Sequence, residues 1–155
     1  MGLVKHKRLL LGVFLAFIPI AAICQSAEYT EIIEQRQALY REIGTAVKAI
    51  RDETRKSAPM NFVIKSSVKR IASGLREVQP MFPEGSGPEA GIETKALESI
   101  WKNKAEFESR YTKAIEQADK LVLVAKQKDM KKTRAQLKSL GRECKGCHDK
   151  FRFDE

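Results

Sequence analysis

The sequence holds few of the side chains that build most metal and redox sites. Its 155 residues include 2 histidines, 3 cysteines and 1 tryptophan, together with 9 glycines and 5 prolines. So few cysteines and histidines exclude a disulfide framework and a module with several zinc ions. The low glycine and proline content excludes collagen-like and proline-rich chains. Any metal or redox chemistry must therefore be concentrated at a small number of positions.

Hydrophobic residues make up 43% of the chain and charged residues 32%, a balance that can bury one core and is unlike that of a disordered chain. A net charge of +9 would suit a nucleic-acid-binding protein. The basic runs at 126–128 and 131–132, however, lack interleaved aromatic residues and a nucleic-acid-binding motif. We interpret them as solvated surface, with docking of a partner as the alternative, and predict no nucleic-acid partner.

The first 27 residues have the pattern of an export signal. Three basic residues and no acid lie in the first eight positions, and the fifteen residues from Leu9 to Ile23 are uncharged. That stretch is shorter than the roughly 20 residues that span a bilayer. We predict cleavage after Ser26 or Ala27, a periplasmic protein, and no stable membrane insertion after cleavage. An uncleaved anchor and a lipid-modified Cys24 are the alternatives.

Removal of residues 1–27 changes the net charge of the chain and the number of its histidines and cysteines. The mature domain, 28–155, keeps 26 lysines and arginines against 20 acids, a net charge of +6. It also keeps a single histidine, His148, and two cysteines, Cys144 and Cys147. The candidate chemistry therefore lies within five consecutive residues.

The mature domain has the periodicity of an all-α protein. Apolar residues recur at steps of three and four in four segments, at 32–50, 64–78, 100–125 and 130–151. Pro59 is expected in the first turn of the second helix, and Asp129 is expected to cap the fourth. Glycine and proline mark the stretch 80–93 as the one long loop. We therefore predict an antiparallel four-helix bundle.

Cys144, Cys147 and His148 form the pattern C-x-x-C-H, by which c-type haem is attached. Two thiols add across the two porphyrin vinyl groups, and the adjacent imidazole becomes an axial iron ligand. On a helix the three side chains share one face. A redox dithiol usually lies in an α/β context, which is absent, and a zinc site would need a fourth ligand. We predict one covalently bound haem c per chain.

The motif and three other segments together resemble the cytochrome c′ family over residues 28–155. The segments are Arg36-Gln37-Ala38-Leu39-Tyr40, Ile100-Trp101 and Phe151-Arg152. The resemblance implies a haem-bearing last helix of a four-helix bundle, a periplasmic location and often an antiparallel homodimer. It also implies that Arg36 and Gln37 approach the haem propionates, and that Arg152 lies near the ligand imidazole.

The residues themselves agree with these implied roles. Arg36 falls on the apolar stripe of its helix, where an arginine is costly unless paired, and a propionate is the predicted partner. Arg152 follows His148 by one predicted turn, on the same face. Trp101 is predicted to pack in the core against the haem. Ordinary surface arginines and a haem-free tryptophan are the alternatives. Gly44 either leaves room for the porphyrin or is an ordinary helix glycine, costing about 1 kcal/mol.

The resemblance also implies that the residue four after Arg36 occupies the distal face of the haem. Methionine stands there in low-spin relatives, but this chain has Tyr40. A neutral phenol with a pKa near 10 is a poor iron ligand. We therefore predict that Tyr40 caps a five-coordinate iron. A core tyrosine away from the iron, and a different sixth ligand such as lysine, are the alternatives; the methionines at 60, 81 and 130 are not expected there.

These predictions give an exported monohaem c-type cytochrome that transfers electrons to redox partner proteins, binds diatomic gases such as NO and CO, or does both. The alternatives are a low-spin electron carrier with another sixth ligand, and a haem enzyme of peroxidase-like or NO-consuming type. An enzyme of that type would need a distal acid–base group, usually histidine or arginine, and no distal histidine exists. We therefore predict a protein that is not an enzyme. A haem-free module that adheres to anionic surfaces is a further alternative.

Overall fold

The computed structural model describes residues 20–153, and side chains from residue 28 onward. Most of the predicted signal segment, residues 1–19, lies outside the described residues, and the predicted cleavage point falls within the first helix. The helices are α1 (Ile20–Glu53), α2 (Asn61–Val78), α3 (Ser99–Lys102), α4 (Lys104–Lys126) and α5 (Met130–Phe151), with a 3₁₀ turn, η1, at Pro88–Ala90. None of these described helices is long and apolar enough to cross a membrane.

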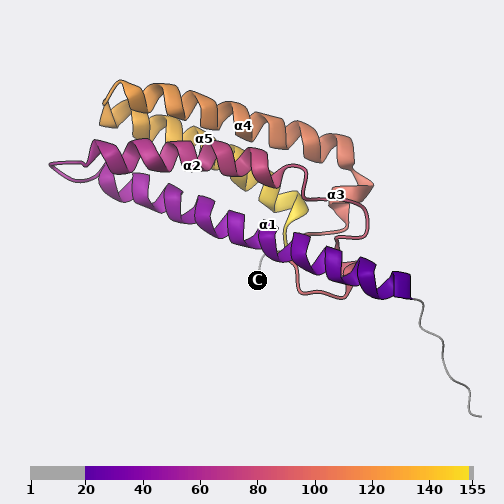
Figure 1. Cartoon of the computed structure of the whole chain (residues 1–155). Helices are drawn as coiled ribbons and strands as arrows, with labels where there is room; N and C mark the ends of the chain where they lie inside the picture. The colour runs from indigo at the N-terminus through magenta and orange to yellow at the C-terminus, as the bar shows by residue number, and fades with distance from the viewer. Residues whose placement is uncertain (1–19, 154–155) are drawn as a thin grey trace, which may run out of the picture.

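The four long helices form the predicted antiparallel bundle (Figure 1). α1 packs along α2, α4 packs along α5, and α2 joins the two pairs by packing on α4. In contrast, α1 and α5 touch at few positions. The bundle is therefore closed on three sides and open between its first and last helices.

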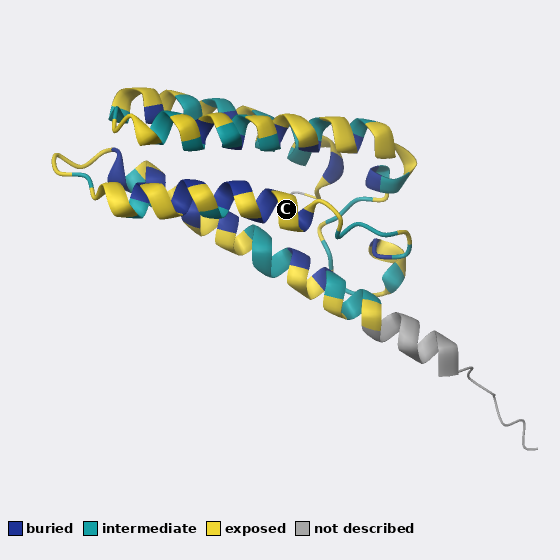
Figure 2. Ribbon diagram, turned by 45° about the horizontal axis from the view of Figure 1, so that its top comes forward, coloured by how far each residue is buried: buried dark blue, intermediate teal, exposed yellow. Residues whose placement is uncertain are grey.

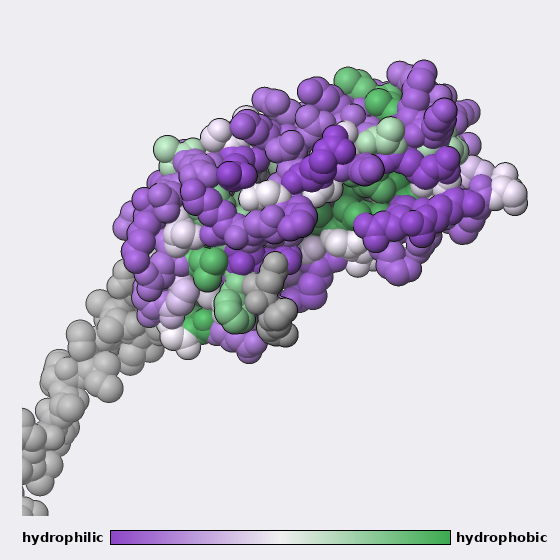
Figure 3. All heavy atoms as spheres, turned by 180° about the vertical axis from the view of Figure 1, so that it is seen from behind, coloured by the Kyte–Doolittle hydropathy of each residue, from purple (hydrophilic) through white to green (hydrophobic). Residues whose placement is uncertain are grey.

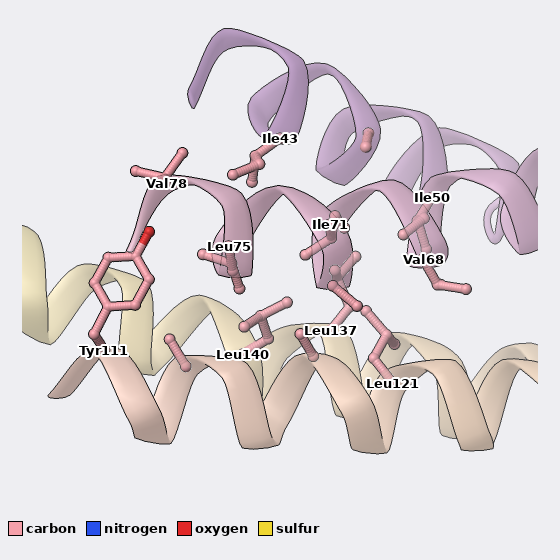
Figure 4. Close-up of a cluster of buried hydrophobic side chains, with 14 of the residues drawn as sticks. Ile43, Ile50, Val68, Ile71, Leu75, Val78, Tyr111, Leu121, Leu137 and Leu140 are labelled. Carbon is pink, nitrogen blue, oxygen red and sulfur yellow. The ribbon is translucent and has the colours of Figure 1, made fainter. Parts of the chain in front are cut away.

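The core is apolar and continuous along the bundle axis. In Figure 4, Ile43 and Ile50 of α1 and Ile71 of α2 face Leu121 of α4 and Leu140 of α5. Figure 2 shows the buried residues on the inward faces of the helices and the exposed residues outside. Each such buried aliphatic side chain contributes about 1.5–3 kcal/mol relative to an exposed one.

Two details of the predicted helices are wrong, and one is confirmed. The expected third helix is split, because Asn103 leaves the helical conformation at φ −126°, ψ 45°. Pro59 lies before the N-cap residue Met60 and not in the first turn of α2. Asp129 does cap α5, where its side chain accepts a hydrogen bond from the backbone N–H of Lys132 at 2.9 Å.

The long connection from α2 to α3 is held against the end of α5. Ala96 and Arg152 form an isolated antiparallel bridge. The N–H of Leu97 donates to Phe151 at 3.1 Å, and the N–H of Phe153 donates to Lys95 at 2.8 Å. The predicted loop is thus longer than 80–93 and contains η1. It forms one end of the open side of the bundle.

Candidate functional site

A cavity of about 1330 Å³ lies between α1 and α5. Its apolar floor includes Ile43 and Val47 of α1, Leu75 of α2, and Leu137 and Leu140 of α5. Figure 3 shows hydrophobic atoms at the bottom of a hollow with hydrophilic rims. Pockets for small ligands usually measure roughly 300–1,000 Å³. This cavity therefore has room for a large, mostly apolar group.

Cys144, Cys147 and His148 all line this cavity. Helical spacing brings them to one side of α5, as the motif predicted. Both cysteines are free thiols. Burial raises the pKa of Cys147 to about 11 and also raises the pKa of Cys144. Reactive dithiols have lowered pKa values, so these surroundings argue against the redox-dithiol alternative.

The back of the motif is fixed to α4 by Arg110, which the sequence analysis did not single out. Its Nη1 donates to the carbonyl oxygen of Gly146 at 3.2 Å, and its Nε donates to Glu106 at 3.0 Å. Glu106 also pairs with Lys150 of α5. A Cβ atom at Gly146 would lie 3.3 Å from Arg110 Nη1, so the glycine permits this close approach. These contacts hold one side of α5 on α4 and leave the opposite side to the cavity.

Arg36 is 2% exposed, and the protein itself supplies its partners. Nη1 donates to the carbonyl oxygen of Met81 at 3.0 Å and to Ser86 Oγ at 3.3 Å. Nη2 donates to the carbonyl oxygen of Ser86 at 3.0 Å and to Thr94 Oγ1 at 3.1 Å. The guanidinium also lies 4.5 Å from the ring centroid of Phe82, and burial lowers its pKa. The expected burial is therefore correct, but a propionate is not needed to compensate for it.

Gln37 makes a similar attachment, since its Nε2 donates to the carbonyl oxygen of Glu93 at 2.8 Å. Arg36 and Gln37 thus hold the connection between α2 and α3 against α1. Both residues line the cavity. Their approach to haem propionates stays a prediction.

Tyr40 projects from α1 into the same cavity. Its hydroxyl donates to the hydroxyl of Tyr111 of α4 at 3.3 Å. Burial raises the pKa of Tyr40 to about 12 and raises the pKa of Tyr111 as well. Both phenols are therefore neutral at physiological pH. Tyr111 was not predicted as a site residue, because helical periodicity does not identify a partner on another helix.

Trp101 packs against the core, as predicted. Its indole N–H donates to the carbonyl oxygen of Pro83 at 2.9 Å, which supports the connection between α2 and α3. Its neighbour Ile100 lines the cavity and Trp101 does not, so its contact with the haem stays a prediction. Arg152 follows the last residue of α5, and its backbone is extended. It therefore does not share a helix face with His148, contrary to the prediction from the sequence. It nevertheless lines the cavity together with His148.

The other residues considered for the sixth position fall into two groups. Met60, Met81 and Met130 do not line the cavity. Three lysines do: Lys95, Lys138 and Lys145. Gly44 also faces the cavity, and a Cβ atom there would meet no atom within 4 Å.

Residues 31–152 match the family model described as Cytochrome C′. The chain belongs to the cytochrome c′ family. A cytochrome c′ from Rhodopseudomonas palustris is 31% identical over 124 residues, which cover 79% of this chain and 82% of that protein. The structure of cytochrome c prime from Shewanella frigidimarina is 28% identical with a TM-score of 0.73, covering 81% of this chain and 97% of that one.

A third similar structure is the nitric oxide complex of the L16A mutant of cytochrome c prime from Alcaligenes xylosoxidans. It is 22% identical with a TM-score of 0.73, and the match covers 82% of this chain and 97% of that one. At this identity the likeness concerns the fold. As a member of the cytochrome c′ family, this protein is a haem-binding c-type cytochrome with one covalently attached haem c per chain. The free thiols, the adjacent imidazole and the large apolar cavity fit that cofactor.

Proposed function

We propose that this protein is an exported monohaem cytochrome with a five-coordinate iron, which binds diatomic gases such as NO and CO, carries electrons, or does both. The observation that supports a five-coordinate iron is the neutral Tyr40 hydroxyl bonded to Tyr111 in the wall of the cavity. A phenol whose pKa is raised to about 12 is not available as a phenolate ligand at neutral pH.

When bound, haem c supplies an iron that changes between the ferric and ferrous states and takes an added ligand. Cys144 and Cys147 would hold its edge through thioethers, and His148 would hold the iron. Arg36 and Gln37 line the cavity where they would lie near the propionates. Tyr40, kept in position by Tyr111, would exclude water and bulky ligands from the distal side.

Binding of a gas molecule requires that the ring of Tyr40 move aside, and this displacement costs packing free energy. Tyr40→Ala should therefore raise the affinity of the ferrous protein for CO, about tenfold for each 1.4 kcal/mol of packing released. Tyr40→Met would offer a thioether at the same position and should give a low-spin, six-coordinate spectrum. CO titration of the wild type beside both variants measures these effects.

Two results would contradict a five-coordinate iron capped by Tyr40. One is a wild type that is already low-spin, and the other is an unchanged CO affinity in Tyr40→Ala. Either would favour a low-spin electron carrier with another sixth ligand. The lysines that line the cavity are the candidates for that ligand. The similar Alcaligenes protein was solved as a nitric oxide complex, which supports gas binding as the first function to test.

We propose no enzymatic step. Among the residues that line the cavity, His148 is the one imidazole, and it is assigned to the iron. The four terminal N–H donors of Arg36 are used by the connection between α2 and α3, so this arginine is not available as a distal acid–base group. Members of the family are in general electron carriers or gas-binding proteins.

Export to the periplasm is supported by the basic start and the uncharged stretch up to Ile23. Haem-loaded protein purified from a periplasmic extract should begin at Ala27 or Glu28, which intact mass spectrometry reads directly. A mass that includes residues 1–26 would indicate an uncleaved anchor.

A homodimer is supported by a shallow groove on the outer side of α1 and α2. Small residues line it, among them Ala38, Ala46, Ala49 and Ser66, and charged residues border it, namely Arg41, Glu42 and Arg70. Small side chains allow two helices to approach closely. Ala49→Arg should shift the haem-loaded protein to monomer in light scattering, whereas an unchanged mass would place the interface elsewhere.

A further inference from the structure

The positive charge of the described chain is concentrated around the cavity. Ten lysines and arginines line it, against two acids, Glu93 and Asp149. The rest of residues 28–153 carries sixteen basic and sixteen acidic residues. The whole excess of positive charge therefore belongs to the cavity between α1 and α5.

Most of these cations are exposed, and six of them lie in two rows that border the cavity. Arg41 and Arg51 come from α1, Arg55 lies in the turn after it, and Arg134, Lys138 and Arg142 come from α5; we call these six residues the cationic rim.

Four members of the rim lack an acidic partner. Arg41, Arg51, Arg55 and Lys138 make no ion pair among the described residues. Away from the cavity, basic and acidic residues are equal in number, and some of them form ion pairs, such as Arg76 with Asp119. The rim therefore carries an excess of positive charge, although Arg51 and Arg55 lie near enough to Asp52 to lower the pKa of that carboxyl.

The rim is larger than the cofactor requires. The two propionates of a haem would neutralise at most two of the ten lining cations. Arg134 precedes Cys144 by ten residues, about 15 Å along α5, so the rim continues well beyond the haem motif. Arg134 also donates to the carbonyl oxygen of Thr54 and joins α5 to α1 at this end.

We propose that the cationic rim is the docking surface for an acidic redox-partner protein. A partner seated on it would lie over the cavity that Cys144, Cys147 and His148 line, so this inference rests on the proposed electron-carrying function. Opposite charges across an interface speed encounter and set orientation. An anionic membrane fits less well, because the exposed large apolar side chains of the described residues do not line the cavity; they are Met60, Phe62, Leu123 and Phe153.

The test compares two haem-loaded triple variants with equal loss of charge. The rim variant is Arg51→Gln/Arg55→Gln/Lys138→Gln. The control is Lys69→Gln/Lys113→Gln/Lys120→Gln, three exposed lysines outside the cavity with no ion pair among the described residues. Binding of fluorescein-labelled poly-L-glutamate, as a stand-in for an acidic protein surface, is followed by anisotropy at several salt concentrations. Vesicles of phosphatidylglycerol form the second arm.

The rim variant should bind polyglutamate about tenfold more weakly at low salt, or roughly 1.4 kcal/mol, and the control less than about twofold. The difference should shrink above about 0.1 M salt, where the screening length is about 10 Å. Equal affinities of the two variants would overturn the proposal. Vesicle binding that is tighter than polyglutamate binding and is lost in the rim variant would overturn it in favour of a lipid surface.

A separate measurement distinguishes failure of the docking surface from failure of the proposed function. Stopped-flow oxidation of the reduced haem protein by hexacyanoferrate(III), an anion, should slow in the rim variant and keep its rate in the control. A wild type that exchanges no electrons with this reagent would contradict electron transfer itself, while the polyglutamate result would still decide whether the rim binds acidic surfaces.

Discussion

At the scale of single residues, the hydrogen-bonded phenols of Tyr40 and Tyr111 make the haem-free protein less stable at alkaline pH. Burial raises the pKa of Tyr40 to about 12, whereas an unfolded chain releases the same proton near pH 10. Between these values the unfolded state loses a proton that the folded state keeps, so the free energy of unfolding falls as pH rises. The stabilisation is complete below about pH 10 and is lost through pH 12.

We therefore expect the haem-free protein, made as Cys144→Ala/Cys147→Ala, to lose roughly 2–3 kcal/mol between pH 9 and 12 through Tyr40. Adding Tyr40→Phe and Tyr111→Phe should remove this part of the loss and leave the part due to lysines. Urea unfolding at a series of pH values measures the difference. Identical pH profiles with and without the phenols would show that the pair does not resist ionisation.

Arg36 gives a second prediction at this scale. Its planar guanidinium donates four hydrogen bonds to the connection between α2 and α3, and the single nitrogen of lysine cannot reproduce that fork. Arg36→Lys should lower the free energy of unfolding by about 2 kcal/mol. Arg41→Lys, at an exposed position, should change it by less than about 0.5 kcal/mol. Equal effects would mean that the hydrogen bonds do not anchor the connection.

Sequence reasoning located Arg36 but not its partners. The apolar stripe of its helix was sufficient to predict burial, because periodicity reports which face of a helix points inward. Its acceptors, Met81, Ser86 and Thr94, come from an irregular segment whose path no periodicity describes. Tyr111 was missed for a different reason: its partner Tyr40 lies on another helix, 71 residues away, and periodicity does not show which helices meet.

At the scale of the helices, alanine substitutions at three glycines distinguish the effect of helix propensity on stability from the effect of the space available for a side chain. A Cβ atom at Gly44 would meet nothing within 4 Å, whereas one at Gly74 would lie 2.9 Å from Ile43 Cγ1. Gly44→Ala should therefore stabilise the haem-free protein by about 1 kcal/mol. Gly74→Ala should destabilise it, and Gly141→Ala, in open space on α5, should act like Gly44→Ala.

Thermal unfolding of the haem-free and haem-loaded forms then decides what Gly44 is for. If the gain from Gly44→Ala persists in the loaded protein, Gly44 is an ordinary helix glycine. If the gain reverses there, the absence of a side chain at Gly44 makes room for the cofactor; Gly141 lines the same cavity, and Gly141→Ala tests that position in the same way. A destabilised haem-free Gly44→Ala would contradict the open space at this position.

The helices themselves were predicted well, and their ends less well. The four periodic segments correspond to α1, α2, α4 and α5, and Asp129 was identified as a cap because its side chain acts locally. The break at Asn103 was missed. Apolar residues continue at helical spacing across it, so the periodicity does not reveal the change in direction between α3 and α4.

At the scale of the whole molecule, the open side of the bundle explains what covalent haem does for the fold. α1 is well packed on α2, and α5 on α4, but α1 and α5 meet at few positions beyond the hydrogen bond from Arg134 to Thr54. The wall of the cavity that α1 and α5 form therefore lacks support from the protein alone. This could not be predicted from the amphipathic patterns, which show that each helix has an apolar face but not which faces meet.

We therefore expect haem loading to protect α1 and α5 more than α2 and α4. Hydrogen exchange is measured on the loaded protein and on the Cys144→Ala/Cys147→Ala variant, since exchange reports local opening. Amides of 36–51 and 134–148, which bound the cavity, should exchange at least about tenfold more slowly when loaded. Amides of 64–75, on the closed side, serve as the internal control and should change less. Uniform slowing across all four helices would mean that the haem stabilises the bundle globally and that α1 and α5 do not open by themselves.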